Sequence, residues 1–393
     1  MVRKWRYKFL LSVFGAFALL VSCGGSGDGK VCLSWKETAP MTQNKFCVKF
    51  YVENSGSMNG YLCDGSAFKN VIHYYANELE DIADTTNLFF LNSQVIPFKD
   101  DIDDYTLEMT PQTFDKFGGI TTSSSLDKMF GLVLDNMNSS TVSVFVSDCI
   151  LAVPYGQAEK YFSIAKDNVK KVFVKALKKH PDLGVEIFCL NSRFEGKYYQ
   201  YGKSPKQINC QRPYYMWLIG SQKLLGEINR KIGTSDMEGL VQQVGFSNCS
   251  GIPFSIVNEH GVAGNKTSLV SRTKGKKAKF LVRADLSSTL QGESYLENVD
   301  NYEKKSPLVA IEEVRKIEDP NYTHEIALSI FDKAQLDECI KVKSMEVPQW
   351  VSEKNDMTGQ NLKKTAGIKY IVGGVADAYK SILQPEGIKI TIK

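Results

Sequence analysis

The 393-residue sequence predicts an α/β protein with a doubly wound, mostly parallel sheet, a second, β-sandwich-like domain and a C-terminal helix. Two observations predict this fold. Between residues 45 and 233, strand-like runs alternate with helical periodicity, which is typical of parallel sheets with crossover helices. Between residues 237 and 350, alternating strand-like runs are separated by turn-rich segments, and helical periodicity is scarce.

The first 22 residues have the layout of a secretory signal peptide, with basic residues before an apolar run from Phe9 to Val21. The run is shorter than the ~20 residues of a membrane-spanning helix. It ends in Leu-Val-Ser-Cys23, which resembles the lipobox of bacterial lipoproteins. That resemblance implies that Cys23 carries a lipid and that the protein is a membrane-anchored lipoprotein of the cell envelope, on its periplasmic or cell-surface side. The alternative is a plain signal peptide whose cleavage leaves Cys23 free.

Charge and cysteine usage narrow the classes of partner and cofactor. The chain has 48 Lys and Arg against 44 Asp and Glu, and the signal peptide contains four of the basic residues and none of the acidic ones. The mature chain is therefore nearly neutral, and we expect no nucleic-acid partner.

We expect Cys47, Cys149 and Cys189 to be thiols in core strands. Zinc is not expected, because the cysteines and four histidines lack zinc-site spacing.

The predicted central strand begins at Cys47 and carries β-branched and aromatic residues. It is followed by Glu53-Asn54-Ser55-Gly56-Ser57, which has no apolar side chain. A carboxylate and two hydroxyls at alternate positions beyond the carboxyl end of a strand form an oxygen-rich group. Oxygen ligands of this kind suit a hard divalent cation such as Mg²⁺.

The other elements of the first domain follow from periodicity. In chain order, the first elements are a helix at 66–84, a strand at 87–91, an antiparallel edge strand at 94–98 and a helix at 123–136. They are followed by a strand at 142–146, a helix at 157–179, a strand at 184–190, a last strand at 214–219 and a closing helix at 221–232. We interpret the four aspartates between Asp100 and Asp104 as a solvated loop, because an EF-hand would need a glycine and a terminal glutamate.

The predicted domain organisation has five parts. A signal peptide covers residues 1–22 and a flexible glycine-rich tether covers residues 23–44. The α/β domain covers 45–233, and the β-rich domain, with strands near 252–257, 278–286 and 324–331, covers 237–350. The C-terminal part, 351–393, has a helix at about 361–383 and a final strand at 387–392, which the sequence assigns to neither domain.

Three motifs together resemble the metal site of von Willebrand factor A domains. Glu53-Asn54-Ser55-Gly56-Ser57 resembles the first motif of this family, Asp-x-Ser-x-Ser after a central strand. Residues 117–123 resemble its Gly-Gly-Thr loop, and residues 142–148 resemble its fourth strand and third metal-site loop. The resemblance implies a vWA-like, Rossmann-like sheet and one set of metal ligands: Glu53, Ser55, Ser57, Thr121 and Asp148. Two departures are that Glu53 stands where the family has aspartate and that Thr121 lies one residue late.

The same resemblance implies a function. Domains of this family mostly mediate protein contacts, in which bound Mg²⁺ or Mn²⁺ completes its coordination with an acidic side chain of the partner. We therefore predict a lipid-anchored binding or adhesion module with a MIDAS-like site, and not an enzyme. One alternative is a vWA-like scaffold that has lost its metal. Another is an exported serine hydrolase of the penicillin-binding type, because Ser66 and Lys69 have the Ser-x-x-Lys spacing.

Overall fold

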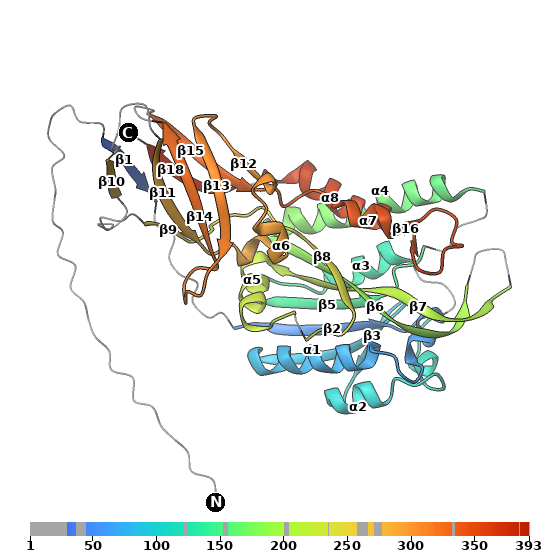
Figure 1. Ribbon diagram of the computed structural model, residues 1–393. Helices are drawn as coiled ribbons and strands as arrows, with labels where there is room; N and C mark the ends of the chain where they lie inside the picture. The colour runs from blue at the N-terminus through green and yellow to red at the C-terminus, as the bar shows by residue number, and fades with distance from the viewer. Residues whose placement is uncertain are drawn as a thin grey trace, which may run out of the picture.

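The computed structural model describes residues 30–36, 45–121, 125–151, 156–199, 204–234, 236–257, 266–270, 277–331, 335–384 and 386–392. These residues form two lobes (Figure 1). The larger lobe is built on a seven-stranded sheet, and the smaller lobe, here called the sandwich lobe, on two antiparallel sheets. The predicted signal peptide, 1–22, and Cys23 lie outside the described residues.

The seven-stranded sheet is mixed, so the predicted doubly wound, mostly parallel sheet is wrong. Its strands, in spatial order, are β4 (Val95–Phe98), β3 (Thr85–Leu91), β2 (Cys47–Glu53), β5 (Thr141–Ser147), β7 (Lys206–Ser221), β6 (Leu183–Tyr198) and β8 (Leu240–Phe246). Strands β3, β2 and β5 form a parallel block. All other neighbouring pairs are antiparallel.

The prediction failed at β7, which lies between β5 and β6 and runs antiparallel to both. Strands β6 and β7 form a long hairpin, paired from Leu183 with Ser221 to Tyr198 with Lys206. A parallel pair needs a crossover of a dozen or more residues, usually a helix, and the link between these strands is too short for one. Side-chain alternation is the same in both strand directions, so the periodicity used for the prediction does not report direction.

Helices cover both faces of this sheet (Figure 1). One face carries α1 (Phe68–Ile82), α2 (Ile102–Leu107), α5 (Gln222–Lys231) and the 3₁₀ helices η1 (Met58–Leu62) and η2 (Phe114–Lys116). The other face carries α3 (Leu126–Asp135), α4 (Ala158–Lys179), α7 (Gln349–Glu353) and α8 (Ile368–Ile382). Each face has its own hydrophobic core, so central strands such as β5 are buried on both sides.

The acidic run predicted as a solvated loop instead begins a helix. Asp101 is the N-cap residue of α2, and its carboxylate accepts a hydrogen bond of 2.9 Å from the Asp104 amide. Asp103 and Asp104 lie in the first turn, where the helix dipole favours negative charge. The run therefore stabilises a helix terminus.

The C-terminal helix α8 belongs to the larger lobe and packs against α4. Lys166 of α4 and Asp377 of α8 form an ion pair of 2.8 Å. Gly374 permits the close approach of the two helices, because a Cβ there would lie 2.6 Å from the Lys166 carbonyl oxygen. The chain then returns to the other lobe as β18 (Ile388–Ile392).

The sandwich lobe has two antiparallel sheets that enclose one shared core. The five-stranded sheet has the order β10 (Lys266–Val270), β1 (Lys30–Trp35), β18, β15 (Leu336–Val342) and β12 (Tyr302–Lys304). The four-stranded sheet has the order β13 (Val309–Lys316), β14 (His324–Phe331), β11 (Lys277–Ala284) and β9 (Phe254–Val257). Shorter elements of the chain are η3 (Ser287–Thr289), α6 (Glu293–Leu296), η4 (Val299–Asn301), β16 (Asn355–Asp356) and β17 (Thr365–Ala366).

Strand β1 falls within residues 23–44, which the sequence predicts to be a flexible tether. It pairs with β10 and β18, and its side chains Leu33 and Trp35 are buried in the shared core. Residues 30–35 are thus part of the folded lobe. The core position of these two apolar side chains explains why this short stretch forms a strand.

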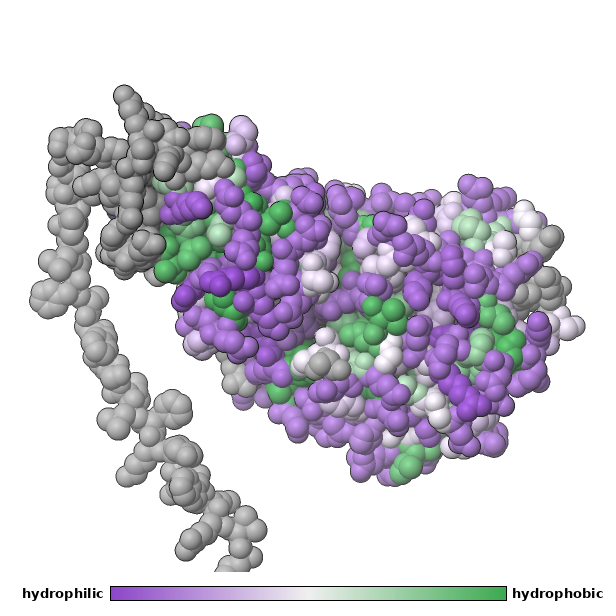
Figure 2. All heavy atoms as spheres, viewed as in Figure 1, coloured by the Kyte–Doolittle hydropathy of each residue, from purple (hydrophilic) through white to green (hydrophobic). Residues whose placement is uncertain are grey.

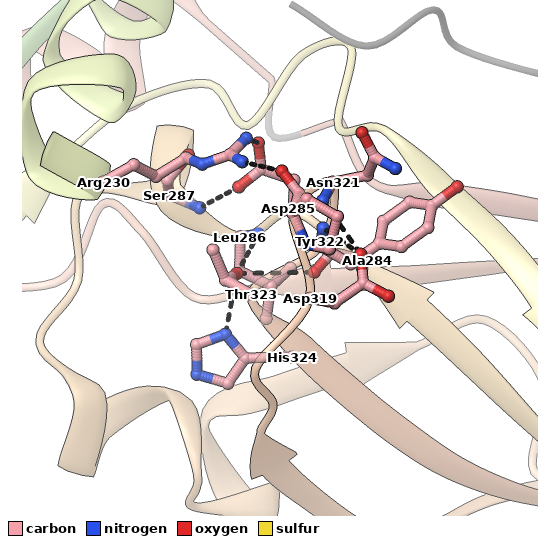
Figure 3. A network of polar contacts seen from close by, with 11 residues as sticks. Arg230, Ala284, Asp285, Leu286, Ser287, Asp319, Asn321, Tyr322, Thr323 and His324 are labelled. Carbon is pink, nitrogen blue, oxygen red and sulfur yellow. Dashed lines mark hydrogen bonds and ion pairs between the residues drawn. The ribbon is translucent and has the colours of Figure 1, made fainter.

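The two lobes are joined by a polar junction between α5 and the segments around η3 (Figure 3). Arg230 donates hydrogen bonds to the Asp285 carboxylate, at 3.0 Å, and to the Pro320 carbonyl. Asp285 is buried, and its second oxygen accepts from the Ser287 amide at 3.2 Å. The junction is closely packed, because a Cβ on Gly226 of α5 would lie 2.8 Å from a backbone nitrogen of η3.

Two of the three cysteines predicted to be core thiols are buried. Cys149 and Cys189 are fully buried and form no disulfide, whereas Cys47 is partly exposed. Burial raises the pKa of Cys149 above its ordinary range, so it is not an activated nucleophile.

Candidate functional site

The polar residues after β2 and β5 converge at one edge of the seven-stranded sheet, because parallel neighbours end on the same side. Glu53 ends β2 and accepts a hydrogen bond from the hydroxyl of Ser147, which ends β5. The Ser55 and Ser57 hydroxyl oxygens are 3.0 Å apart, and the Ser57 hydroxyl lies close enough to Asp148 to lower the pKa of that carboxyl. We call Glu53, Ser55, Ser57 and Asp148 the β2–β5 site.

Asp148 is the buried carboxylate of this site. Its Oδ1 atom accepts from the Ile150 amide at 3.2 Å, whereas Oδ2 is buried without a hydrogen-bond partner among the described residues. Burial raises the pKa of Asp148, whereas the positive charge of Arg212, the Ile150 amide and the Ser57 hydroxyl oppose that rise. A buried carboxylate oxygen without a partner costs free energy, so a cation or a donor at this point stabilises the fold.

Thr121 reaches the site through its backbone. Its carbonyl oxygen accepts a hydrogen bond of 3.1 Å from the Gly56 amide, which joins the predicted Gly-Gly-Thr loop to the loop after β2. The Thr121 side chain is partly exposed. Residues 122–124, the rest of that motif, lie outside the described residues.

Two asparagines connect the Gly-Gly turn to the same edge. The Asn92 amide donates to Asn54 Oδ1 at 2.9 Å and to the Gly118 carbonyl at 2.7 Å. Gly119 has φ +74°, and a Cβ there would lie 2.0 Å from Asn92 Oδ1. Glycine is therefore required at this position, both for the backbone conformation and for the contact with Asn92.

Sequence reasoning missed Arg212, a buried guanidinium on β7 whose positive charge acts on Asp148. Its Nη1 atom donates to the Leu362 carbonyl at 3.2 Å, and its guanidinium carbon lies 4.4 Å and 5.4 Å from the ring centres of Tyr198 and Phe194. Its Nε and Nη2 atoms are buried without partners among the described residues. The guanidinium thus supplies a positive charge that acts on the Asp148 carboxylate.

A signal for Arg212 was present in the sequence. Arg212, Tyr214 and Met216 occupy alternate positions of β7 and therefore share one face, and Tyr214 and Met216 are core residues of that face. A charged residue that continues a buried apolar face needs a compensating partner. That pattern predicts a buried ionic site, although it does not name Asp148.

The segment of residues 355–366 covers this part of the hairpin. The Tyr198 hydroxyl donates to the Gly359 carbonyl at 2.9 Å, and the Tyr215 hydroxyl donates to Thr365 Oγ1 at 3.1 Å. The segment is closed on itself by the Asp356 carboxylate, which accepts from several of its backbone amides. It therefore keeps Arg212 out of solvent.

The Ser-x-x-Lys pair of the hydrolase hypothesis is not assembled as a catalytic pair. The Ser66 hydroxyl lies 2.8 Å from the Ser192 hydroxyl and accepts from the Phe68 amide at 3.2 Å. No hydrogen bond between Ser66 and Lys69 is present among the described residues. Ser66 instead bonds the first amide of α1, which is the role of a residue that precedes a helix.

Acidic, histidine and cysteine side chains do not gather in threes or more in a metal-binding arrangement anywhere in the described part of the chain. A cation at the β2–β5 site would therefore rely on two carboxylates, on hydroxyl oxygens and on water.

Neither a protein-family model nor a curated protein matches this chain.

Proposed function

We propose that this chain is a lipid-anchored binding protein of the cell envelope, which engages an acidic side chain of a protein partner through a divalent cation at the β2–β5 site. The observation that carries the proposal is the Asp148 Oδ2 atom, which is buried and without a partner among the described residues. It belongs to a group in which every side chain offers oxygen, the ligand that Mg²⁺ and Mn²⁺ prefer.

The donor set fits a weakly held cation. Asp148 and Glu53 supply the negative charge, and Ser55 and Ser57 supply neutral oxygens. Glu53 is turned toward Ser147, so Asp148 and Ser57 are the residues that we expect to matter most. Once bound, the cation would supply an open coordination position that attracts a carboxylate.

Arg212 sets the charge balance of the site. Its guanidinium is buried, so it acts on an incoming group through its charge and not by contact at the surface. That charge repels a cation and attracts a carboxylate. The site should therefore hold a cation poorly alone and better when an acidic partner side chain arrives with it.

The membrane part of the proposal rests on sequence, because Cys23 lies outside the described residues. None of the helices in the described ranges is long and apolar enough to cross a membrane. Lasting attachment by lipid needs more than one acyl chain, which lipoprotein modification supplies. Replacing Cys23 by alanine should move the protein from the membrane fraction to the soluble fraction. Membrane retention of a processed Cys23→Ala protein would contradict the lipid anchor.

The cation part is tested by isothermal titration of the mature chain with Mn²⁺ and Mg²⁺, alone and with a short aspartate-containing peptide as a carboxylate probe. We expect weak binding of the metal alone and tighter binding with the peptide. Asp148→Asn should abolish binding and Ser57→Ala, at a partly exposed position, should weaken it. Asp81→Asn, on an exposed position of α1, is the matched control. A wild-type protein that binds neither metal would show that the edge is a polar rim without a metal.

A further inference from the structure

A second candidate site lies between the lobes and shares no residue with the β2–β5 site. It is a cleft of about 720 Å³, within the roughly 300–1,000 Å³ of small-molecule sites. Its walls are β8, residues 291–295 at the start of α6, and residues 346–350 at the start of α7. Strand β8 is the edge strand of the seven-stranded sheet, so one of its sides is available to the cleft.

The cleft is rich in planar polar side chains. Five of its lining residues carry amides: Gln242, Gln243, Gln291, Asn301 and Gln349. Glu293 and Glu346 add carboxylates, and no lysine, arginine or histidine is among the residues that line it. This composition disfavours phosphate and other anionic ligands, because nothing in the lining would compensate their charge. Figure 2 shows that polar side chains also dominate the surface on this view of the molecule.

Three of the amide side chains are fixed by hydrogen bonds from their nitrogen atoms. The Nε2 atoms of Gln243, Gln291 and Gln349 donate to the Glu186 carboxylate at 2.6 Å, the Gly245 carbonyl at 2.6 Å and the Glu353 carboxylate at 2.8 Å, respectively. Their Oε1 atoms accept no hydrogen bond from the described residues. Amides fixed through nitrogen present oriented acceptors, and hydroxyl groups are the donors that match them.

Tyr295 supplies the partly exposed aromatic ring of the lining, whereas Trp350 lies mostly in the core of the larger lobe. The Tyr295 hydroxyl donates to the Lys343 carbonyl at 2.7 Å, which fixes that ring in a partly buried position. Trp350 is 9% exposed, and its Nε1 atom has no partner among the described residues. Aromatic faces pack well against the apolar C–H faces of sugar rings, while planar amides bond the hydroxyl groups around the ring edge.

We propose that this cleft binds a neutral oligosaccharide. Oriented amide acceptors, the partly exposed Tyr295 ring and the lack of basic groups together match a ligand with many hydroxyls and no negative charge. An extended peptide added to β8 fits less well, because Gln291 already occupies the Gly245 carbonyl on this strand. This second site works without the cation of the proposed function.

The test is saturation-transfer NMR and isothermal titration in EDTA with four trisaccharides: chitotriose, cellotriose, maltotriose and mannotriose. We expect at least one to bind with a Kd on the order of 1 mM or tighter. Gln349→Ala should weaken binding about five- to tenfold, the value of one hydrogen bond. Gln112→Ala, exposed and outside the cleft, should leave it unchanged.

A steric variant keeps the test decisive if Gln349→Ala affects folding. Gly292 has φ −67°, where any residue is allowed, and a Cβ there would lie 3.5 Å from Gln243 Oε1. Gly292→Leu should therefore fill the cleft and abolish binding, whereas Asp148→Asn should retain it. Failure of all four sugars to bind, equal binding by Gly292→Leu, or competition by an unrelated extended peptide would each overturn the proposal.

Discussion

The guanidinium carbon of Arg212 lies 4.4 Å from the centre of the Tyr198 ring, and the Tyr198 hydroxyl in turn bonds to the Gly359 carbonyl. This stack, beneath the segment 355–366, fixes a buried cation near Asp148. The charge of the guanidinium acts on the Asp148 carboxylate and opposes the rise in its pKa that burial causes.

Removal of the Arg212 guanidinium should destabilise the protein. In Arg212→Met the aliphatic stem is kept, but Asp148 loses its nearby positive charge. We expect the free energy of unfolding to fall by about 1–3 kcal/mol, measured by urea denaturation, because the bond to the Leu362 carbonyl and the charge that acts on Asp148 are both lost. Arg193→Met is the control, because Arg193 is exposed and pairs with Glu195 at 2.7 Å. It should cost no more than about 1 kcal/mol. Equal effects of the two substitutions would contradict the buried role of Arg212.

The same substitution should improve cation binding. With the guanidinium charge removed, Arg212→Met should bind Mn²⁺ more tightly than the wild type when no partner is present. Arg212→Lys keeps the charge and should bind as weakly as the wild type. Titration of the three proteins at one ionic strength measures this. Identical Mn²⁺ affinities in all three proteins would mean that the charge of Arg212 does not affect cation binding.

The parts of the fold that periodicity predicted are those that depend on one buried face. Helix α1 was located because Val71, Ile72, Tyr75 and Leu79 recur at helical spacing, and all four are buried. The direction of β7 could not be predicted in the same way, because a strand has the same pattern in both directions. The α2 helix could not be predicted in this way either, because its N-terminus is stabilised by the Asp101 cap and its acidic residues give no apolar period.

In the candidate site, too, some residues could be predicted from the sequence and one could not. Glu53, Ser55, Ser57 and Asp148 could be grouped from sequence, because residues after parallel neighbouring strands meet at one edge. The position of Arg212 depends on the β6–β7 hairpin and on a hydrogen bond to the distant segment 355–366. Long-range contacts of this kind leave no local pattern in the sequence.

Glu186 should make stability depend on pH. Burial raises its pKa from the ordinary value of 4.5 to about 7, and hydrogen bonds from Asn229 and Gln243 oppose the rise. Because the folded-state pKa is the higher one, the stability that this carboxyl contributes is fully present below about pH 4.5 and is lost as the pH rises through about 7.

Replacing Glu186 by glutamine should therefore stabilise the protein more at pH 8 than at pH 5, relative to the wild type. Urea denaturation at several pH values between 5 and 8 measures the difference. Glu80→Gln, on the exposed surface of α1, should keep the wild-type pH profile. Parallel pH profiles for the wild type and Glu186→Gln would show that the pKa of the Glu186 carboxyl is not raised in the folded protein.

The junction between the lobes offers a further test. Arg230→Ala leaves the buried Asp285 carboxylate without its ion pair and also removes the bond to the Pro320 carbonyl. We expect a loss of about 1–3 kcal/mol, since the Arg230 side chain is 29% exposed and part of its bonding is exchanged for water. Calorimetry should show the two lobes unfolding at more separated temperatures. A single, unshifted transition in Arg230→Ala would mean that this pair does not couple them.

The central claim, a divalent cation at the β2–β5 site, is tested most directly by anomalous diffraction from crystals of the mature protein grown with Mn²⁺ and an aspartate-containing peptide. We expect an anomalous peak within coordinating distance of Asp148 Oδ2 and Ser57 Oγ, at about 2.1–2.3 Å, with a peptide carboxylate on its open side. The peak should disappear in Asp148→Asn and remain in Asp81→Asn. Well-ordered Asp148 and Ser57 side chains with no anomalous density between them would contradict the account.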